Sequence, residues 1–348
     1  YDTACSAALV AYHATHRTLH LHECSNGLTV GVNLMLAPNS AVTFAIAGLT
    51  SVSGRSHTWD VCADGYARAE ACSATTLRPM RDTSKPQSLL GTNGSAVRQD
   101  GRSASLTAPN GQAQQSLLGA ALGEHGTSAL TLLLNEAHGT GTALGDPIEM
   151  GSLVGAVLVN RDSHGAPLPV GGVKANIGHA EPAAGMTGLL KLALGLQYCQ
   201  AVPNAKLRAL NPHVGGALRN AVCALLAQFA MPCMADGAIS GGVSSFGFAG
   251  TIVHVLVAVG YSMAATPNLL CSGACAAVCC VKESVCLLLY RRRIFSWCME
   301  ECSVDDLIPA EISSYACGWK HSINVATQIT QAPFHSLCVC NARAIDST

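Results

Sequence analysis

The sequence predicts an α/β protein built on a doubly wound parallel sheet. Two stretches repeat one order of elements: a buried apolar strand, a polar glycine-rich loop and a helix. The first repeat has a strand at 129–137 and a helix from about Pro147, and the second has a strand at 166–173 and a helix over 183–199. This alternation is typical of βα units, in which ligand-binding side chains collect in the loops after the strands.

Hydrophobic periodicity and turn residues predict the remaining elements. Residues 5–20 have the small and apolar composition of a helix, and the β-branched run 27–36 predicts a strand. Residues 53–72 are polar and rich in turn formers, which predicts a loop. The other predicted elements are a strand at 88–97, a helix within 109–126, and two strands joined by a glycine turn at 238–259.

Composition argues against several classes of function. Charged residues make up 12% of the 348 residues and the formal net charge is -1, so no surface for nucleic acid is expected. The most apolar stretch is interrupted by Lys282 and Glu283, which argues against a membrane span. The sequence begins at Tyr1 and shows no signal-peptide pattern. We expect a cytoplasmic protein or one in the stroma of an organelle.

The 17 cysteines are distributed unevenly, with 7 in residues 1–260 and 10 in residues 261–348. The C-terminal region lacks paired C-x-x-C knuckles with the spacing of a zinc site. A disulfide framework would require an oxidising compartment. We therefore expect 261–348 to be a poorly structured, cysteine-rich extension with no assigned fold, and we expect no metal site.

Cys5 stands at the head of a predicted helix, in DTACSAAL. Unpaired N–H groups and the helix dipole lower the pKa of a thiol in that position, which favours the reactive thiolate. The alternative is a buried cysteine with a purely structural role, and the local sequence leaves both interpretations open. A nucleophile would need partner side chains from elsewhere in the chain.

Two glycine-rich loops offer such partners. His138 follows the buried strand in EAHGTGTALGDPIE, where glycines allow the backbone to approach a ligand closely. In KANIGHAEPAAG, Lys174 precedes His179 by five residues, and its ammonium would keep the imidazole neutral or orient it. Asp146 and Glu149 lie at a predicted helix start, where carboxylates favour the helix dipole. Solvated polar loop residues and a capped helix are the alternative interpretation.

Six motifs in this order resemble the ketosynthase (β-ketoacyl synthase) domain of type I polyketide synthases: DTACSAAL, DGYARAEAC, TAPNGQAQQ, EAHGTGTALGDPIE, KANIGHAEPAAG and GGVSSFGFAGT. The resemblance covers residues 1–260 and implies the thiolase-like fold, in which two similar halves stack as αβαβα layers. The family has a long segment before the first motif. We therefore expect a ketosynthase domain at 1–260 that lacks its N-terminal strands and exposes a sheet edge.

The resemblance also implies catalytic roles. Cys5 would be the acylated nucleophile, and His138 and His179 would hydrogen-bond the carbonyl of the extender thioester during decarboxylation. Lys174 would support the His179 site electrostatically. Thr140 and Thr142 would contact the pantetheine arm of the substrate. Phe248 matches a gating phenylalanine, whose backbone would help to form an oxyanion hole with the Cys5 N–H.

The predicted function is therefore β-ketoacyl synthase activity: acyl transfer to Cys5, then decarboxylative Claisen condensation with a malonyl-type thioester. The resemblance implies no directly bound cofactor, substrates carried on the phosphopantetheine of an acyl carrier protein, and a homodimer in the full-length protein. One alternative is a cysteine hydrolase, which needs an orienting Asn or Asp and neither Lys174 nor a second histidine. The other is a catalytically inactive, truncated ketosynthase that acts only as a binding or interaction module.

Overall fold

The computed structural model describes residues 1–79, 90–105, 108–124, 126–161, 166–219, 221–228, 239–259 and 339–340. The helices in this part of the chain are α1 (Ala7–His20), α2 (Pro38–Ile46), α3 (Gly111–Glu124), α4 (Gly145–Ala156), α5 (Lys174–Ile177), α6 (Ala184–Tyr198) and α7 (Pro212–Leu218). The strands are β1 (Gly27–Asn33), β2 (Ala71–Leu77), β3 (Gly91–Gln99), β4 (Leu132–Glu136), β5 (Leu168–Gly171), β6 (Cys223–Leu225), β7 (Ile239–Phe246), β8 (Thr251–Val259) and β9 (Val339–Cys340).

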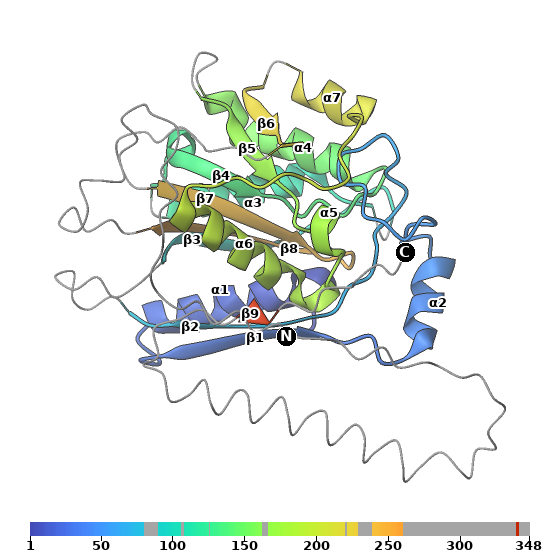
Figure 1. Cartoon of the computed structure of the whole chain (residues 1–348). Coiled ribbons are helices and arrows are strands. Elements are labelled where there is room, and N and C mark those ends of the chain that lie inside the picture. The colour runs from blue at the N-terminus through green and yellow to red at the C-terminus, as the bar shows by residue number, and fades with distance from the viewer. Residues whose placement is uncertain are drawn as a thin grey trace, which may run out of the picture. The chain divides into compact units, whose positions relative to one another are not determined.

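The larger sheet has six strands in the order β3-β8-β7-β4-β5-β6 (Figure 1). Strands β7, β4, β5 and β6 are parallel, whereas β8 is antiparallel to both β7 and β3. The parallel arrangement predicted from the two strand–loop–helix repeats is therefore found in β7, β4, β5 and β6, while the two strands predicted around a glycine turn at 238–259 form the antiparallel pair β7–β8. The reason is the turn 247–250 between β7 and β8, which is too short for a crossover helix and returns the chain antiparallel.

A smaller sheet has the strand order β1-β2-β9, and β1 pairs with β2 in antiparallel register from Gly27↔Leu77 to Asn33↔Ala71. Helices α1 and α6 lie between the two sheets (Figure 1). Helix α1 contacts β1, β3 and β8, and α6 contacts β2, β4 and β7. Helix α3 packs on β3 and β8 and also contacts α4. Helix α4 in turn contacts α7. The result is a layered, mixed α/β architecture.

Among the described residues, the two largest apolar clusters hold these layers together, and burial of their surface is the main stabilising term. The first lies around α1 and α6 and includes Leu9, Leu189, Leu192 and Val255. The second includes Trp59 and Met150 and contains side chains of α3, α4 and α7. Ten of the 15 residues of α6 are buried, as expected for a helix that is apolar on all sides and central in the fold.

Most elements lie where the sequence predicts them, but α2 and β2 do not. Pro38 begins α2, and none of the helix residues is buried, so no apolar stripe marks this helix in the sequence. Strand β2 begins at Ala71, inside the segment 53–72 that the sequence predicts to be a loop. Its side chains are mostly small or threonine, and they alternate between buried and more exposed positions. Such a sequence predicts a strand only weakly when the pairing with β1 is not known.

The chain divides into one unit of residues 1–274 with 338–348, and a second unit of residues 275–337. The second unit lies outside the described residues, as does almost all of the predicted extension 261–348. The expectations for that region therefore stay predictions. Among the helices of the described residues, none is long and apolar enough to cross a membrane.

The contact between α1 and α6 at Gly185 gives a test of the packing. A Cβ added to Gly185 would lie 2.7 Å from Leu9 Cβ and 3.1 Å from Ser245 Cβ. We expect Gly185→Ala to lower the free energy of unfolding by about 1–3 kcal/mol through overpacking, although alanine is the better helix former by about 1 kcal/mol. Urea denaturation measures the change.

The matched control is Gly151→Ala in α4. Gly151 is exposed, and a Cβ there would meet no atom within 4 Å. This variant is expected to gain up to about 1 kcal/mol from helix propensity alone. If both variants gained stability equally, the close α1–α6 contact would be disproved.

Candidate functional site

Cys5 lies in the 3₁₀ turn Ala4–Ser6, which leads directly into α1. Ala4 has a φ of 52°, in the left-handed region that non-glycine residues rarely adopt, and this turns the chain sharply before the thiol. Cys5 is only 8% exposed. The Ser245 hydroxyl on β7 donates to the Cys5 carbonyl at 2.7 Å, which fixes the turn against the end of the larger sheet.

His179 makes the contact that defines the site, because its Nε2 lies 3.0 Å from the Cys5 Sγ. The backbone of His179 bridges a distant loop: its N–H donates to the Ala67 carbonyl at 2.7 Å and its carbonyl accepts from the Ala69 N–H at 2.9 Å. The Tyr66 ring packs edge-on against the imidazole with centroids 4.7 Å apart. The His179 side chain is thus fixed in position by a second chain segment.

A partly buried ion pair reinforces that bridge. Arg68 Nε lies 2.6 Å from Glu181 Oε1, and Arg68 Nη2 lies 3.0 Å from Glu181 Oε2. Two parallel N–H···O bonds of this kind set orientation as well as distance. The pair joins the loop before β2 to the turn that carries His179. Sequence reasoning missed Arg68, Glu181 and Tyr66, since nothing local indicates their partners.

His138 supplies a second imidazole, with its ring centroid 5.6 Å from that of His179. The Phe246 N–H donates to His138 Nδ1 at 3.3 Å. A neutral imidazole that accepts at Nδ1 carries its proton on Nε2, so His138 offers an Nε2–H donor. The Phe246 ring also lies 5.5 Å from the His138 ring. Phe246 is therefore a site residue that sequence reasoning missed.

Two buried carboxylates shape the His138 loop. Glu149 accepts from the backbone N–H groups of His138 at 2.7 Å and Gly139 at 2.8 Å. Asp146 accepts from the Trp59 N–H at 2.7 Å and from a loop glycine at 3.1 Å. Asp146 lies in the first turn of α4, as the sequence predicts, and both carboxylates also bind backbone segments outside that helix. Burial raises the pKa of Asp146 to about 7.

Thr140 and Thr142 lie in the same loop with their hydroxyls 3.3 Å apart, and Thr142 Oγ1 also accepts from the Gly145 N–H at 3.2 Å. Gly141 between them has a φ of +80°, and a Cβ there would lie 2.8 Å from the His57 nitrogen. The glycine is thus required by the close approach of a neighbouring loop, and the predicted close approach of a ligand to this loop stays a prediction.

Lys174 is buried at the first position of α5, and its Nζ donates to the His138 carbonyl. It contacts the His138 loop, whereas its effect on His179 acts through its charge. Burial lowers the pKa of both imidazoles well below its usual range, and the Lys174 ammonium acts in the same direction. Both histidines are therefore neutral at physiological pH.

The Cys5 thiol does not have the depressed pKa expected from its helix. Burial raises its pKa to about 11, against the opposing charge of Lys174. The backbone N–H groups of Phe248 and of Cys5 itself also act to lower it, which places both donors near the sulfur. Burial of the thiol away from water therefore changes its pKa more than the helix N-terminus does. The resting site is a neutral thiol beside neutral imidazoles. The Phe248 side chain itself is 45% exposed.

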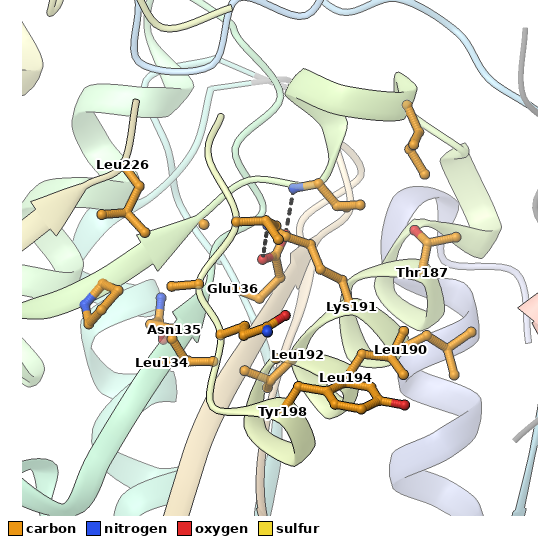
Figure 2. Close-up of a pocket in the computed structure, with 18 residues that line it drawn as sticks. Leu134, Asn135, Glu136, Thr187, Leu190, Lys191, Leu192, Leu194, Tyr198 and Leu226 are labelled. Carbon is orange, nitrogen blue, oxygen red and sulfur yellow. Dashed lines mark hydrogen bonds and ion pairs between the residues drawn. The ribbon is translucent and has the colours of Figure 1, made fainter. Parts of the chain in front are cut away.

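A cavity of about 280 Å³ lies next to these loops, between β4, β5 and α6. Its wall is mostly apolar, and Figure 2 shows Glu136 and Lys191 side by side within it. Cys5, His138, Lys174 and His179 do not line it. The cavity is therefore lined by residues next to the loops of the site, such as Glu136 and Lys191, and the thiol and imidazoles lie outside it.

The structure describes the side chains of Cys5, Cys24, Cys62, Cys72, Cys199 and Cys223, and none of these six forms a disulfide bond. Within the part of the chain that the structure describes, no group of three His, Cys, Asp or Glu side chains is arranged to hold a metal ion.

Comparison with known families agrees with this geometry. Residues 1–83 match the family described as "Beta-ketoacyl synthase, N-terminal domain", and residues 91–208 match "Beta-ketoacyl synthase, C-terminal domain". A phenolphthiocerol/phthiocerol polyketide synthase of Mycobacterium tuberculosis is 39% identical over 270 residues, which is 77% of this chain and 14% of that protein. Erythronolide synthase EryA2 of Saccharopolyspora erythraea is 38% identical over 258 residues, covering 74% of this chain and 7% of that protein.

Solved structures give the same result. The ketosynthase from module 6 of the bacillaene synthase of Bacillus subtilis 168 superposes with a TM-score of 0.71 at 30% identity, over 75% of this chain and 47% of that one. The oxazolomycin ketosynthase domain OzmH KS7 of Streptomyces albus JA3453 gives 0.71 at 33% identity, over 77% and 47%. The predicted thiolase-like α/β fold is confirmed, and the chain belongs to the β-ketoacyl synthase family as a ketosynthase of the type I polyketide synthase kind.

Proposed function

We propose that this chain carries out the condensing reaction of polyketide synthesis, with Cys5 as the nucleophile and His138 and His179 as its partners. The observation that carries the proposal is the 3.0 Å contact between Cys5 Sγ and His179 Nε2, with the second imidazole beside it. A nucleophile within hydrogen-bond reach of a base is the arrangement that covalent catalysis needs.

The first step is transfer of an acyl group to the sulfur. As the thiol attacks the carbonyl of an acyl thioester, its proton passes to His179 Nε2. The N–H groups of Cys5 and Phe248, which lie near the sulfur, stabilise the negative charge on the carbonyl oxygen. The carbon–sulfur bond to the carrier then breaks, and the departing thiolate takes the proton back from His179.

The second step is decarboxylation of a malonyl-type thioester. Carbon dioxide leaves and the electron pair moves onto the thioester as an enolate. His138 donates from Nε2, because its Nδ1 is occupied by the Phe246 N–H. His179 can also hold its proton at Nε2, since an acylated sulfur no longer donates to it. Each such donor contributes roughly 3 kcal/mol to stabilising the developing charge.

The third step forms the carbon–carbon bond. The enolate carbon attacks the acyl carbonyl on Cys5, the bond from that carbonyl to sulfur breaks, and the thiolate recovers a proton from the medium. The substrates arrive on the phosphopantetheine of an acyl carrier protein, and we assign contacts with that arm to Thr140 and Thr142. Phe248, with its exposed ring in the turn after β7, is the proposed gate. The active assembly is a homodimer.

The geometry favours condensation over the two alternatives. A cysteine hydrolase needs an Asn or Asp to orient its histidine, yet His179 Nδ1 is buried with no hydrogen-bond partner. A module that only binds partners has no need of a buried thiol, two imidazoles and an ammonium in one cluster. Condensation needs these groups, because the thiol carries the acyl group and the imidazoles donate hydrogen bonds to the enolate.

Single substitutions separate the two half-reactions. We expect Cys5→Ala to abolish acyl loading, measured by protein mass spectrometry with an acyl-pantetheine thioester, while carbon dioxide release from a malonyl thioester persists. His138→Ala should retain loading and lower carbon dioxide release roughly 100- to 1,000-fold. The exposed His213 provides the control, because His213→Ala should change neither rate. Chain elongation by Cys5→Ala would show that the nucleophile is misassigned.

The raised pKa of Cys5 predicts a specific pH dependence. The folded thiol is protonated below about pH 11, so its alkylation by iodoacetamide should increase steadily from about pH 7 to about pH 10 without a plateau. Mass spectrometry of the peptide that contains Cys5 measures the rate. In the urea-unfolded chain the midpoint should fall to the ordinary value of 9.0. A plateau below about pH 8 in the folded protein would instead show a resting thiolate.

A further inference from the structure

We infer that Glu136 is a positioning residue, whose carboxylate fixes the His138 loop relative to the Lys174 turn and to α6. The inference rests on the proposed function for its link to catalysis. Glu136 does not contact the thiol or either imidazole ring, so it acts through the backbone segments that carry them.

The geometry of the carboxylate carries the argument. Glu136 is the last residue of β4 and is 3% exposed. Its Oε1 accepts from the Val173 N–H at 2.5 Å, and its Oε2 lies 2.7 Å from Lys191 Nζ on α6 (Figure 2). Each oxygen therefore holds a different element, and a third element, β4, carries the carboxylate itself.

The three segments joined by the carboxylate, which are the end of β4, Val173 and α6, lie close in sequence to residues of the proposed site. His138 comes two residues after Glu136, Lys174 comes directly after Val173, and α6 is the helix that follows His179. Lys174 in turn donates to the His138 carbonyl, so the two loops are also joined further along. A change in the carboxylate should shift His138 and Lys174 together relative to Cys5.

The Lys191 ammonium explains why a carboxylate occupies this buried place. A buried charge without a partner is costly, and the ion pair satisfies both groups. Replacing Glu136 by glutamine keeps the shape and one acceptor oxygen but removes the charge that holds Lys191. Glu136→Gln is therefore the substitution that loosens the connection with the least change in volume.

Glu124 provides a matched control with the same pattern of bonds. Its Oε1 lies 2.9 Å from Arg17 Nη1 and its Oε2 accepts from the Ser95 N–H at 2.5 Å. These partners lie on α1 and β3, outside the loops that carry His138, Lys174 and His179. Glu124→Gln thus removes the same charge from the same pattern of bonds at a more exposed place, and it should leave the basal activity unchanged.

The first experiment compares both variants of the full chain in two assays. For Glu136→Gln we expect carbon dioxide release from a malonyl-pantetheine thioester to fall on the order of 100-fold, as for a misplaced reacting group. Alkylation of Cys5 by iodoacetamide should stay within about 2-fold, because Cys5 and His179 share no contact with Glu136. An unchanged decarboxylation rate, an equal loss in both assays, or an equal loss in Glu124→Gln would overturn the inference.

The second experiment does not depend on catalysis. Imidazole ¹⁵N NMR reports the state of His138 Nδ1, which accepts from the Phe246 N–H. In Glu136→Gln the His138 signal should shift or broaden, whereas in Glu124→Gln it should match the unsubstituted protein. If the unsubstituted chain releases no carbon dioxide, the proposed function fails, and the NMR comparison still decides the positioning role. An unaltered His138 signal in Glu136→Gln would refute it.

A third variant tests whether the ion pair is the connection. Lys191→Met removes the ammonium and leaves Glu136 in place. If Glu136 and Lys191 act through one interaction, the double variant Glu136→Gln/Lys191→Met should lose no more decarboxylation activity than the more damaging single variant. Multiplication of the two losses would show that the residues act independently and would contradict this account.

Discussion

The site depends on one constraint: a sulfur and two imidazoles are brought together where water is excluded. Cys5 and His179 are 174 residues apart in sequence, and their 3.0 Å contact forms where α1 and α6 meet between the two sheets. Burial makes a thiolate or an imidazolium costly, so the groups rest as neutral partners. In the proposed reaction, their hydrogen-bond donors stabilise the negative charge that develops only as the thioesters react.

The charged groups near the cluster are buried or partly buried, and each has a bonding partner. Lys174 bonds the His138 carbonyl, Glu149 binds two backbone N–H groups, and Arg68 holds Glu181 with two bonds. Glu136 follows the same principle with one backbone and one side-chain partner. Buried carboxylates of this kind are satisfied only in one arrangement of the surrounding loops, so they favour a rigid site.

The sequence predicts properties that are local. The apolar run of α1 and the two strand–loop–helix repeats follow from periodicity and residue type. Residue type and loop position make Cys5, His138, Lys174 and His179 candidates only, and their predicted roles come from the resemblance to ketosynthases. Features that need a distant partner could not be predicted. The raised pKa of Cys5 comes from burial by other segments, and α2 has no buried face to mark it. Likewise, the Phe246 N–H reaches His138 across 108 residues of sequence.

The central claim is that the two imidazoles act on one substrate atom in one pocket. A double-mutant cycle on malonyl-thioester decarboxylation, with His138→Ala, His179→Ala and the double variant, measures this coupling directly. If both rings bind the same enolate oxygen, the loss in the double variant should be clearly smaller than the product of the two single losses. Rate losses that multiply without any coupling would show that the histidines work separately, and the account of a shared condensing site would be wrong.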